Sequence, residues 1–493
     1  MRRTLLASSL MTAYTLLAVI WYWQFHSAVF ALDDPGLIHL FSDNSVTVFD
    51  KTVGNVFANR WRPLTDTAYL LATIAFGKSY FGWWLLSTVL LGALATSSAL
   101  LFSWLSKRMW LGCALGLLVL TSRFSQYQVT QATGLVESIG NLLFVALLAC
   151  LLGYIRGRKP VFLPLIVATF VLIVLTHERY QGLVVAIVAV LVLYGDSRKS
   201  RLLWATAAVA PIVLMTIVKA LVLHIPLAAG PGSTTSLGTS WLTARENTIL
   251  ALADVFGVNL GPPYLAGLSF TSQTIAVQGV SLLVGLLTVL LVVAPLLNRL
   301  GFMTAPRKVS AVARLVLVAV ALAIGLLLPV IVTSRLEQRF VAGAGILVLA
   351  GISYFARREA YFARREALES KNGKWLTRLV LMAFVVASLF MNVKYRENID
   401  SVFFRGAQIA AVQQLSVLVP AFQTSAKSDA RIYLVYSAPD PGWDAILNQL
   451  VEANTDVDPR TITVVPTAGA IPSEPENAVV LAFNTSGVLD RIR

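Results

Sequence analysis

The chain has 493 residues, of which 57% are hydrophobic and only 13% are charged, and its mean hydropathy is +0.74. A water-soluble fold of this length could not bury so much apolar surface, so the composition excludes a soluble enzyme and predicts an integral membrane protein. The net charge of +14 comes from short basic clusters between apolar stretches, a pattern typical of membrane orientation rather than of nucleic-acid binding. Cys113 and Cys150 lie in apolar stretches and show neither a disulfide framework nor metal-ligand spacing.

Eleven apolar stretches are candidates for crossing a hydrocarbon core of about 30 Å. They are Thr4 to Trp23, Tyr80 to Leu105, Trp110 to Thr121, Ser138 to Ile155, Pro160 to Thr176, Tyr180 to Tyr194, Leu202 to Leu223, Thr274 to Leu297, Ala313 to Thr333, Phe340 to Phe355 and Leu376 to Asn392. Several are shorter than the roughly 20 residues of a straight span, so we expect polar residues at their ends to lie within the membrane boundary. The predicted fold is an all-α polytopic membrane protein with about 11 transmembrane helices.

The first stretch has a second interpretation as a cleaved signal peptide. Arg2 and Arg3 precede its apolar run, and Val29-Phe30-Ala31 could serve as a cleavage site. Its length and the aromatic belt Trp21-Tyr22-Trp23 favour a retained span.

Basic residues are concentrated in alternate connections between the spans. These connections hold 21 of the 39 Lys and Arg residues and only four of the 25 acids. Because positively charged connections stay in the cytoplasm, the amino terminus is predicted inside and the carboxyl terminus outside, in a multi-pass protein of a bacterial inner or plasma membrane. One such connection repeats the heptapeptide YFARREA at 354–360 and 361–367, which we interpret as a cytoplasmic helical extension near anionic lipid.

Three segments are predicted outside the spans on the opposite side. The first loop, 32–62, leads through Pro63 into an amphipathic stretch, 64–76, which is expected to lie along the membrane interface. The loop 224–273 contains a predicted helix, Trp241 to Phe256, and is either a lid or a plain connector.

The third outer segment is the tail, 394–493, which is predicted to form a small extracytoplasmic α/β domain after a transmembrane domain at 1–393. Strand-like and helix-like stretches alternate in this tail, at Arg431 to Tyr436, Trp443 to Ala453, Thr461 to Val465 and Val479 to Phe483. No nucleotide-binding glycine pattern and no nucleophile elbow occur there.

Ionisable residues gather near the predicted outer face, where leaving water is costly unless the groups are paired or used. The candidates are Asp33, Asp34, His39, Asp43, Arg60, Arg62, Glu137, His177, Glu178, Arg179, Arg335, Glu337 and Arg339. For Arg179, Arg335 and Glu337 a solvated or structural role is the simpler interpretation, because short turns need polar residues. For Asp33 and Asp34 we favour function, because two adjacent acids repel and leave one of them a proton acceptor. A divalent cation at His39 and Asp43 is possible but matches no strong motif, so no metal site is assigned.

The order of these motifs resembles the GT-C superfamily of membrane glycosyltransferases, in particular the protein O-mannosyltransferase and aminoarabinose-transferase type. The resemblance covers about the first 390 residues by order and topology and leaves the tail unmatched. Its motifs are LDDPG at 32–36, RWRPL at 60–64, GLVESIGNLL at 134–143, THERY at 176–180 and EQRF at 337–340.

The resemblance implies transfer of a sugar from a polyprenyl-phosphate donor to an extracytoplasmic acceptor, which is a lipid, glycan or protein. By the same resemblance Asp33 or Asp34 is the catalytic base. Arg60, Arg62 and Arg339 are the candidates to bind the phosphate, because a planar guanidinium can contact two phosphate oxygens. Glu137, His177, Glu178 and Arg335 complete the expected substrate-binding set, although His177 replaces the Lys often found there. The cofactor is left open, since the sequence permits a divalent cation but does not require one.

Two other functions remain open from the sequence. A polysaccharide polymerase or ligase would share the outward-facing arginines and differ in its acceptor. A transporter or flippase would place ionisable residues near mid-membrane and show paired halves, whereas these spans are nearly charge-free apart from Lys219.

Overall fold

The computed structural model describes most of the helical region and short parts of the tail. The described residues are 2–26, 30, 33–54, 61–224, 240–261, 268–301, 306–332, 336, 338–365, 371–399, 431–436, 453, 462–465, 478–483 and 489–491. A helix corresponds to each predicted span: α1 (Arg2–Tyr22), α5 (Tyr80–Ser106), α6 (Met109–Thr121), α8 (Leu135–Gly157), α9 (Phe162–Thr176), α10 (Val184–Tyr194), α11 (Arg198–Ile217), α14 (Ile275–Gly301), α15 (Pro306–Ile331), α16 (Ala342–Arg365) and α17 (Lys371–Glu397).

The chain is a multi-pass integral membrane protein. Among its described residues, eight helical segments are long and apolar enough to cross a membrane. The remaining three helices, α6, α9 and α10, have only 13, 15 and 11 residues. The predicted total of eleven spans therefore stays a prediction, since three of these helices are too short to cross unaided.

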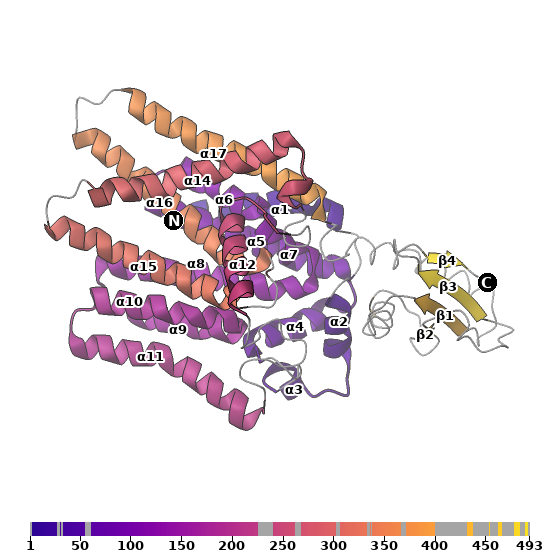
Figure 1. The fold of residues 1–493 in the computed structure, drawn as a ribbon. Coiled ribbons are helices and arrows are strands. Elements are labelled where there is room, and N and C mark those ends of the chain that lie inside the picture. Colours follow the sequence, from indigo (N-terminus) through magenta and orange to yellow (C-terminus); the bar gives the residue numbers. More distant parts are fainter. Residues whose placement is uncertain are drawn as a thin grey trace.

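Short helices lie at one end of the bundle. Figure 1 shows α2 (Asp34–Ser42), α3 (Val48–Thr52) and α4 (Pro63–Phe76) at the end away from the turn that joins α10 to α11. Proline starts α2 and α4, where its missing N–H costs nothing. Thr47 caps α3 by accepting the Asp50 amide at 3.1 Å.

Two further short helices connect spans. In α7 (Arg123–Thr130) the Ser122 hydroxyl accepts the Phe124 amide at 3.1 Å, and in α12 (Trp241–Val255) Ser240 accepts the Thr243 amide at 3.2 Å. The predicted helix 241–256 is thus confirmed as α12, which packs against α15 and α16. Parts of the loop around it lie outside the described residues.

A glycine contact sets how closely α15 approaches the turn between α9 and α10. That turn is the 3-10 helix η3 (Glu178–Leu183), and its Gly182 faces Gly325 of α15. A methyl group on Gly182 would lie 2.3 Å from the Gly325 carbonyl oxygen. Only two glycines allow the backbones to meet here, which fixes the position of the residues that η3 carries.

The tail contains a four-stranded sheet of order β2-β1-β3-β4. Its strands are β1 (Arg431–Tyr436), β2 (Ile462–Val465), β3 (Ala478–Phe483) and β4 (Leu489–Arg491), with β2 and β3 parallel to β1 and β4 antiparallel to β3. The first three lie where alternation predicted strands. The predicted helix 443–453 lies outside the described residues except for Ala453, so the α/β assignment of 394–493 stays a prediction.

Candidate functional site

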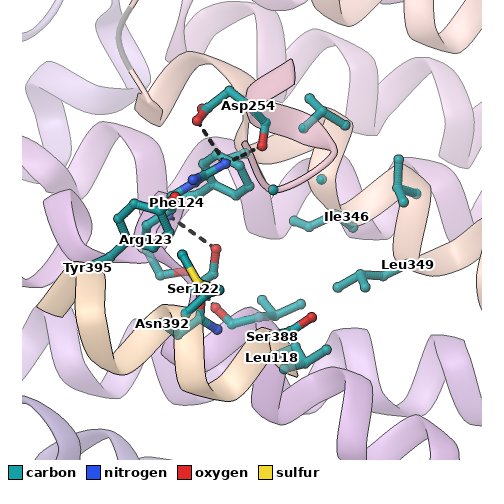
Figure 2. A pocket seen from close by; sticks show the side chains of 18 of the residues that line it. Leu118, Ser122, Arg123, Phe124, Asp254, Ile346, Leu349, Ser388, Asn392 and Tyr395 are labelled. Atoms are coloured by element: carbon teal, nitrogen blue, oxygen red, sulfur yellow. Dashed lines mark hydrogen bonds and ion pairs between the residues drawn. The ribbon is translucent and has the colours of Figure 1, made fainter. Parts of the chain in front are cut away.

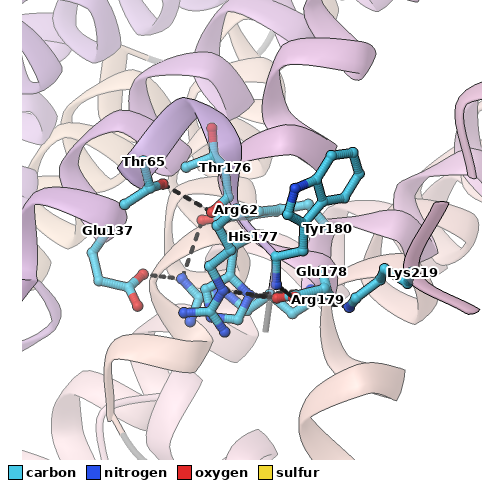
Figure 3. A network of polar contacts seen from close by, with 10 residues as sticks. Arg62, Thr65, Glu137, Thr176, His177, Glu178, Arg179, Tyr180 and Lys219 are labelled. Carbon is cyan, nitrogen blue, oxygen red and sulfur yellow. Dashed lines mark hydrogen bonds and ion pairs between the residues drawn. The ribbon is translucent and has the colours of Figure 1, made fainter. Parts of the chain in front are cut away.

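Glu178 is the centre of a polar cluster drawn from three parts of the chain (Figure 3). Its Oε2 accepts Arg62 Nε at 2.8 Å, and its Oε1 accepts Lys219 Nζ at 3.1 Å. The Trp61 amide donates to Oε1 at 3.4 Å, and His177 Nδ1 lies 3.6 Å from Oε2. We call Trp61, Arg62, His177, Glu178 and Lys219 the Glu178 cluster.

Beside this cluster, Glu137 and Arg179 form a buried ion pair. Arg179 Nη2 donates to Glu137 Oε2, and the side chains are 9% and 1% exposed. Arg179 also contacts the rings of Tyr180 and Phe340, with its Cζ 5.0 Å and 5.3 Å from the two centroids. The predicted residues Arg62, Glu137, His177 and Glu178 are therefore brought together around a fifth residue, Arg179.

Arg339 reaches the same region from the turn before α16. It belongs to the 3-10 helix η6 (Gln338–Val341), and its guanidinium lies 4.1 Å from the Tyr127 ring centroid and 5.3 Å from that of Phe340. Arg179 contacts the same Phe340 ring, and the charges of Arg339 and Arg62 both act on Arg179. Three guanidinium groups thus share one end of the membrane bundle.

Local structure explains why these side chains converge. Arg62 is the residue before α4, and that helix is fastened to the end of α9 by the Thr65 hydroxyl, which donates to the Thr176 carbonyl at 2.9 Å. Glu137 lies in the first turn of α8, where the helix dipole favours a carboxylate. Lys219 lies on a π-helical turn, η4 (Val218–Val222), a deviation often found at functional sites.

The charges in the cluster keep Glu178 ionised. Burial raises the pKa of this carboxyl, but the Arg62 guanidinium, His177 and the Lys219 ammonium act against it and hold the pKa well below its usual range. Glu178 therefore cannot serve as a proton donor near neutral pH. Its chemistry is to hold Arg62 and Lys219 in place.

His177 has a local role at the start of η3. Its Nδ1 accepts the Arg179 amide at 3.2 Å, so the ring caps this short helix. The capping bond fixes the direction in which Glu178 and Arg179 leave the backbone. A Lys at this position would not supply an acceptor, which gives a physical reason for the departure from the resembled motif.

Arg179 retains a donor without an acceptor. Its Nη1 is buried and has no hydrogen-bond partner within the described part of the chain. Burial lowers the pKa of the guanidinium, although it remains cationic at any physiological pH. An unpaired buried donor of this kind is costly, so a ligand with an acceptor oxygen is expected beside it.

The acidic pair is divided by the fold. Asp33 is exposed and precedes α2, whereas Asp34 is fully buried and accepts the amides of Ala132 at 2.9 Å and Thr133 at 2.8 Å. The Thr133 hydroxyl adds a third bond at 3.1 Å. These bonds fasten α2 to the turn directly before α8, which carries Glu137, so Asp34 ties the first loop to the candidate site.

Burial, more than repulsion, perturbs the acidic pair. Desolvation raises the pKa of Asp34 to about 7, and the Asp33 charge is the smallest of the causes. Repulsion between adjacent acids, on which the sequence-based reasoning relied, is thus a minor cause of the raised pKa of Asp34.

The sequence analysis missed some residues of the candidate site, and three of its candidates lie outside the described residues. Arg60 and Arg335 lie outside the described residues, as does Glu337. Lys219 was noted only as an exception in an apolar span, and Tyr127 had no signal at all. Within the described chain, no group of three or more His, Cys, Asp and Glu residues is arranged to hold a metal ion.

A second buried ion pair lies apart from these residues, beside a cavity of about 110 Å³ (Figure 2). Arg123 Nη2 lies 2.7 Å from Asp254 Oδ1, and the two side chains are 4% and 0% exposed. The Cζ of Arg123 also lies 4.6 Å from the centroid of the Tyr395 ring. Burial raises the pKa of Asp254 to about 6 against the lowering effect of Arg123. The pair joins α12 to α7, the helix that carries Tyr127 beneath Arg339.

The chain resembles solved structures more than known sequences. No protein-family model matches the sequence, and no curated protein matches it. The fold is similar to the crystal structure of ArnT from Cupriavidus metallidurans bound to undecaprenyl phosphate, with a TM-score of 0.43 and 13% sequence identity. The match covers 96% of this chain and 92% of that chain.

Proposed function

We propose that this chain is a GT-C type glycosyltransferase, which moves a sugar from a polyprenyl-phosphate donor to a hydroxyl of an extracytoplasmic acceptor. The observation that carries the proposal is the buried Arg179 guanidinium, which has one donor without a partner among the described residues and feels the charges of Arg62 and Arg339. Guanidinium groups pair with phosphate through two parallel hydrogen bonds, and their charge stabilises a phosphate as it departs.

The membrane bundle supports a lipid-borne donor. These arginines lie at one end of helices long enough to span a bilayer, where a phosphate attached to a lipid would be presented. The basic connections, represented by Arg156 in the last turn of α8, lie at the other end of the helix that begins next to Glu137. The charge rule then puts the site on the extracytoplasmic side, with the amino terminus in the cytoplasm.

In the proposed reaction Asp33 is the base. Its exposed carboxylate takes the proton of the acceptor hydroxyl while the hydroxyl oxygen forms a bond to the anomeric carbon. The bond between that carbon and the phosphate oxygen breaks, and polyprenyl phosphate leaves with the electron pair. Arg179, Arg62 and Arg339 balance its charge, and Arg60 and Arg335 remain candidates for the same role. Asp34 positions the loop that carries Asp33.

This function can be tested by deleting the gene in its host and measuring the masses of the surface glycans and exported proteins. Loss of one sugar increment, restored by the wild-type gene but not by Arg179→Gln, is the expected result. Arg245→Gln is the matched control, because Arg245 is an exposed arginine of α12. Loss of a whole repeat or chain would favour the polymerase or ligase. Unchanged glycans with altered solute uptake would contradict the transferase and favour a transporter.

A further inference from the structure

The cavity of Figure 2 is lined at one place by the Arg123 and Asp254 pair and elsewhere mostly by apolar side chains. These side chains come from α5, α6, α14, α16 and α17, and Leu349 lies across the open centre from Arg123 in the figure. The volume of about 110 Å³ gives room for roughly eight water molecules, which is the size class of a single sugar ring.

Two buried amide side chains also line this cavity, Gln128 of α7 and Asn141 of α8. Gln128 Oε1 accepts the Ser138 hydroxyl at 3.4 Å, and Asn141 Oδ1 accepts the Tyr180 hydroxyl at 3.4 Å. Each amide is therefore held on its oxygen side. We call this space the Gln128–Asn141 cavity.

The nitrogen side of both amides is buried without a partner. Gln128 is 1% exposed and Asn141 is fully buried, yet Gln128 Nε2 and Asn141 Nδ2 make no hydrogen bond to any described residue. The hydroxyl of Ser388, which lines the cavity from α17, is in the same condition. Unpaired buried donors are costly, so a molecule that offers acceptor oxygens is expected in the cavity.

Asn141 joins the cavity to the candidate site. It lies one turn after Glu137 on α8, so the two side chains share a face of that helix. Tyr180, which donates to Asn141, also accepts Arg179 Nη2 at 3.3 Å. A methyl group on Gly140 would lie 2.7 Å from Tyr180 Cε2, so this glycine lets the ring pack directly on α8. One hydrogen-bonded side chain thus separates the cavity from the guanidinium assigned to the phosphate.

The lining charges of the cavity cancel. Among the described residues that line it, only Arg123 and Asp254 are charged, and they pair with each other at 2.7 Å. A charged group on a ligand would therefore be buried without a counter-ion, which is costly. A ligand with neutral hydroxyl groups fits better, because its oxygens can accept from the amides and its C–H faces can lie on the apolar walls.

We propose that the Gln128–Asn141 cavity binds the sugar ring of the donor, and that this sugar is neutral, with hydroxyl groups but no amino or carboxyl group. Gln128 Nε2 and Asn141 Nδ2 donate to hydroxyl oxygens of the sugar, while Arg179 contacts the phosphate to which the sugar is attached. The inference rests on the proposed function, since it requires a sugar carried on a polyprenyl phosphate. It adds the substrate class and the residues that select it.

The test compares the binding of bare and sugar-bearing carriers to the purified full chain in detergent. The probes are decaprenyl phosphate, the same carrier bearing glucose, mannose or galactose, and the same carrier bearing an aminopentose, with affinities measured by microscale thermophoresis. At least one neutral hexosyl carrier is expected to bind about tenfold more tightly than the bare carrier. Gln128→Met combined with Asn141→Leu should remove this preference and leave the affinity for the bare carrier unchanged.

Gln126→Met is the matched control. Gln126 lies on the same helix as Gln128, is 1% exposed and has a buried amide without a partner in the described chain, but it does not line the cavity. Its replacement should change the preference for the sugar-bearing carrier less than about twofold. A loss as large as that of the double variant would show a general effect on α7 and overturn the inference.

The remaining outcomes separate the inference from the proposed function. If the wild type binds the bare carrier but prefers no neutral sugar, or prefers the amino sugar, the inference falls and the transferase proposal stands. If it binds no carrier at all, both fall. If the double variant does not fold, the wild type decides with a carrier that bears a tetrahydropyranyl ring, which keeps the ring and lacks the hydroxyls. This carrier should bind no more tightly than the bare one, and binding equal to that of the hexosyl carrier would overturn the inference.

Discussion

Asp33 and Asp34 are neighbours in the chain, but their carboxylates lie in opposite environments. The Asp33 side chain is exposed, whereas the Asp34 side chain is fully buried against the amides of Ala132 and Thr133. An exposed carboxylate can reach a substrate, and a buried one saturated with hydrogen bonds can hold a loop. Substitution of Asp33 should therefore affect activity, and substitution of Asp34 should affect stability.

Replacing Asp33 by asparagine should abolish transfer while the protein remains folded. Removal of a general base typically costs about 100-fold to 10,000-fold in rate. The measurement is sugar transfer by purified protein, with thermal unfolding in detergent as the check on folding. Asp43→Asn, a change at a partly exposed acid of the same loop, is the control and should retain activity. Full activity in Asp33→Asn would remove the base assignment.

Replacing Asp34 by asparagine should flatten the pH dependence of stability. The pKa of Asp34 rises from 3.8 to about 7 on folding, so the folded protein binds the proton more tightly than the unfolded chain does. Stability contributed by the protonated form is present below about pH 4, is lost as pH rises towards 7, and is level above that. The loss is on the order of a few kcal/mol.

Thermal unfolding of both proteins between pH 4 and 8 measures this effect. The wild-type melting temperature should fall across the window, and that of Asp34→Asn should fall much less. A smaller slope should remain from Asp254, whose pKa is also raised, to about 6. Parallel curves for the two proteins would mean that Asp34 does not carry the proton.

The sequence predicted the helices and singled out several residues that the structure brings together, but it did not predict the contacts between those residues. Apolar stretches marked α5 and α8, and alternation marked β1, because each pattern is local. The set Arg62, Glu137, His177 and Glu178 was found from its position at span ends. The burial of Asp34, the pairing of Glu178 with Lys219 and the Arg179 donor depend on contacts between residues more than 40 positions apart. Local patterns contain no record of such contacts.

Arg62 and Glu178 should be energetically coupled. Glu178→Gln leaves Arg62 and Lys219 facing each other without a carboxylate, and Arg62→Gln leaves the carboxylate with fewer cations. A double-mutant cycle on thermal stability should give a coupling of about 1 kcal/mol, moderated by the 17% and 23% exposure of the two side chains. Arg62→Lys should not restore the wild-type value, because the Nε contact is lost. Additive effects of the two changes would contradict the coupling.

Removing one partner of the Arg123 and Asp254 pair should destabilise the protein strongly, whereas replacing both by apolar residues should destabilise it little. Asp254→Asn leaves a buried guanidinium without its carboxylate, which should destabilise the protein by about 3–5 kcal/mol. Changing both residues, Arg123→Met with Asp254→Leu, should recover most of that loss. Because α7 carries both Arg123 and Tyr127, the single variant should also raise the KM for the donor through Arg339. A double variant as unstable as the single one would reject this account.

The contact between Gly182 and Gly325 should not tolerate an added methyl group. An alanine at 325 would place its methyl group 2.5 Å from the Gly182 carbonyl oxygen, so α15 must move away from η3. The packing cost should be about 1–3 kcal/mol, and the displacement of Glu178 and Arg179 should lower transfer by up to about 100-fold. Gly279→Ala is the control, because a methyl group there meets nothing within 4 Å and the residue lies in α14, where alanine favours the helix. Thermal unfolding and transfer rates measured on both variants decide the point, and equal behaviour would show that the close approach of α15 does not position the site.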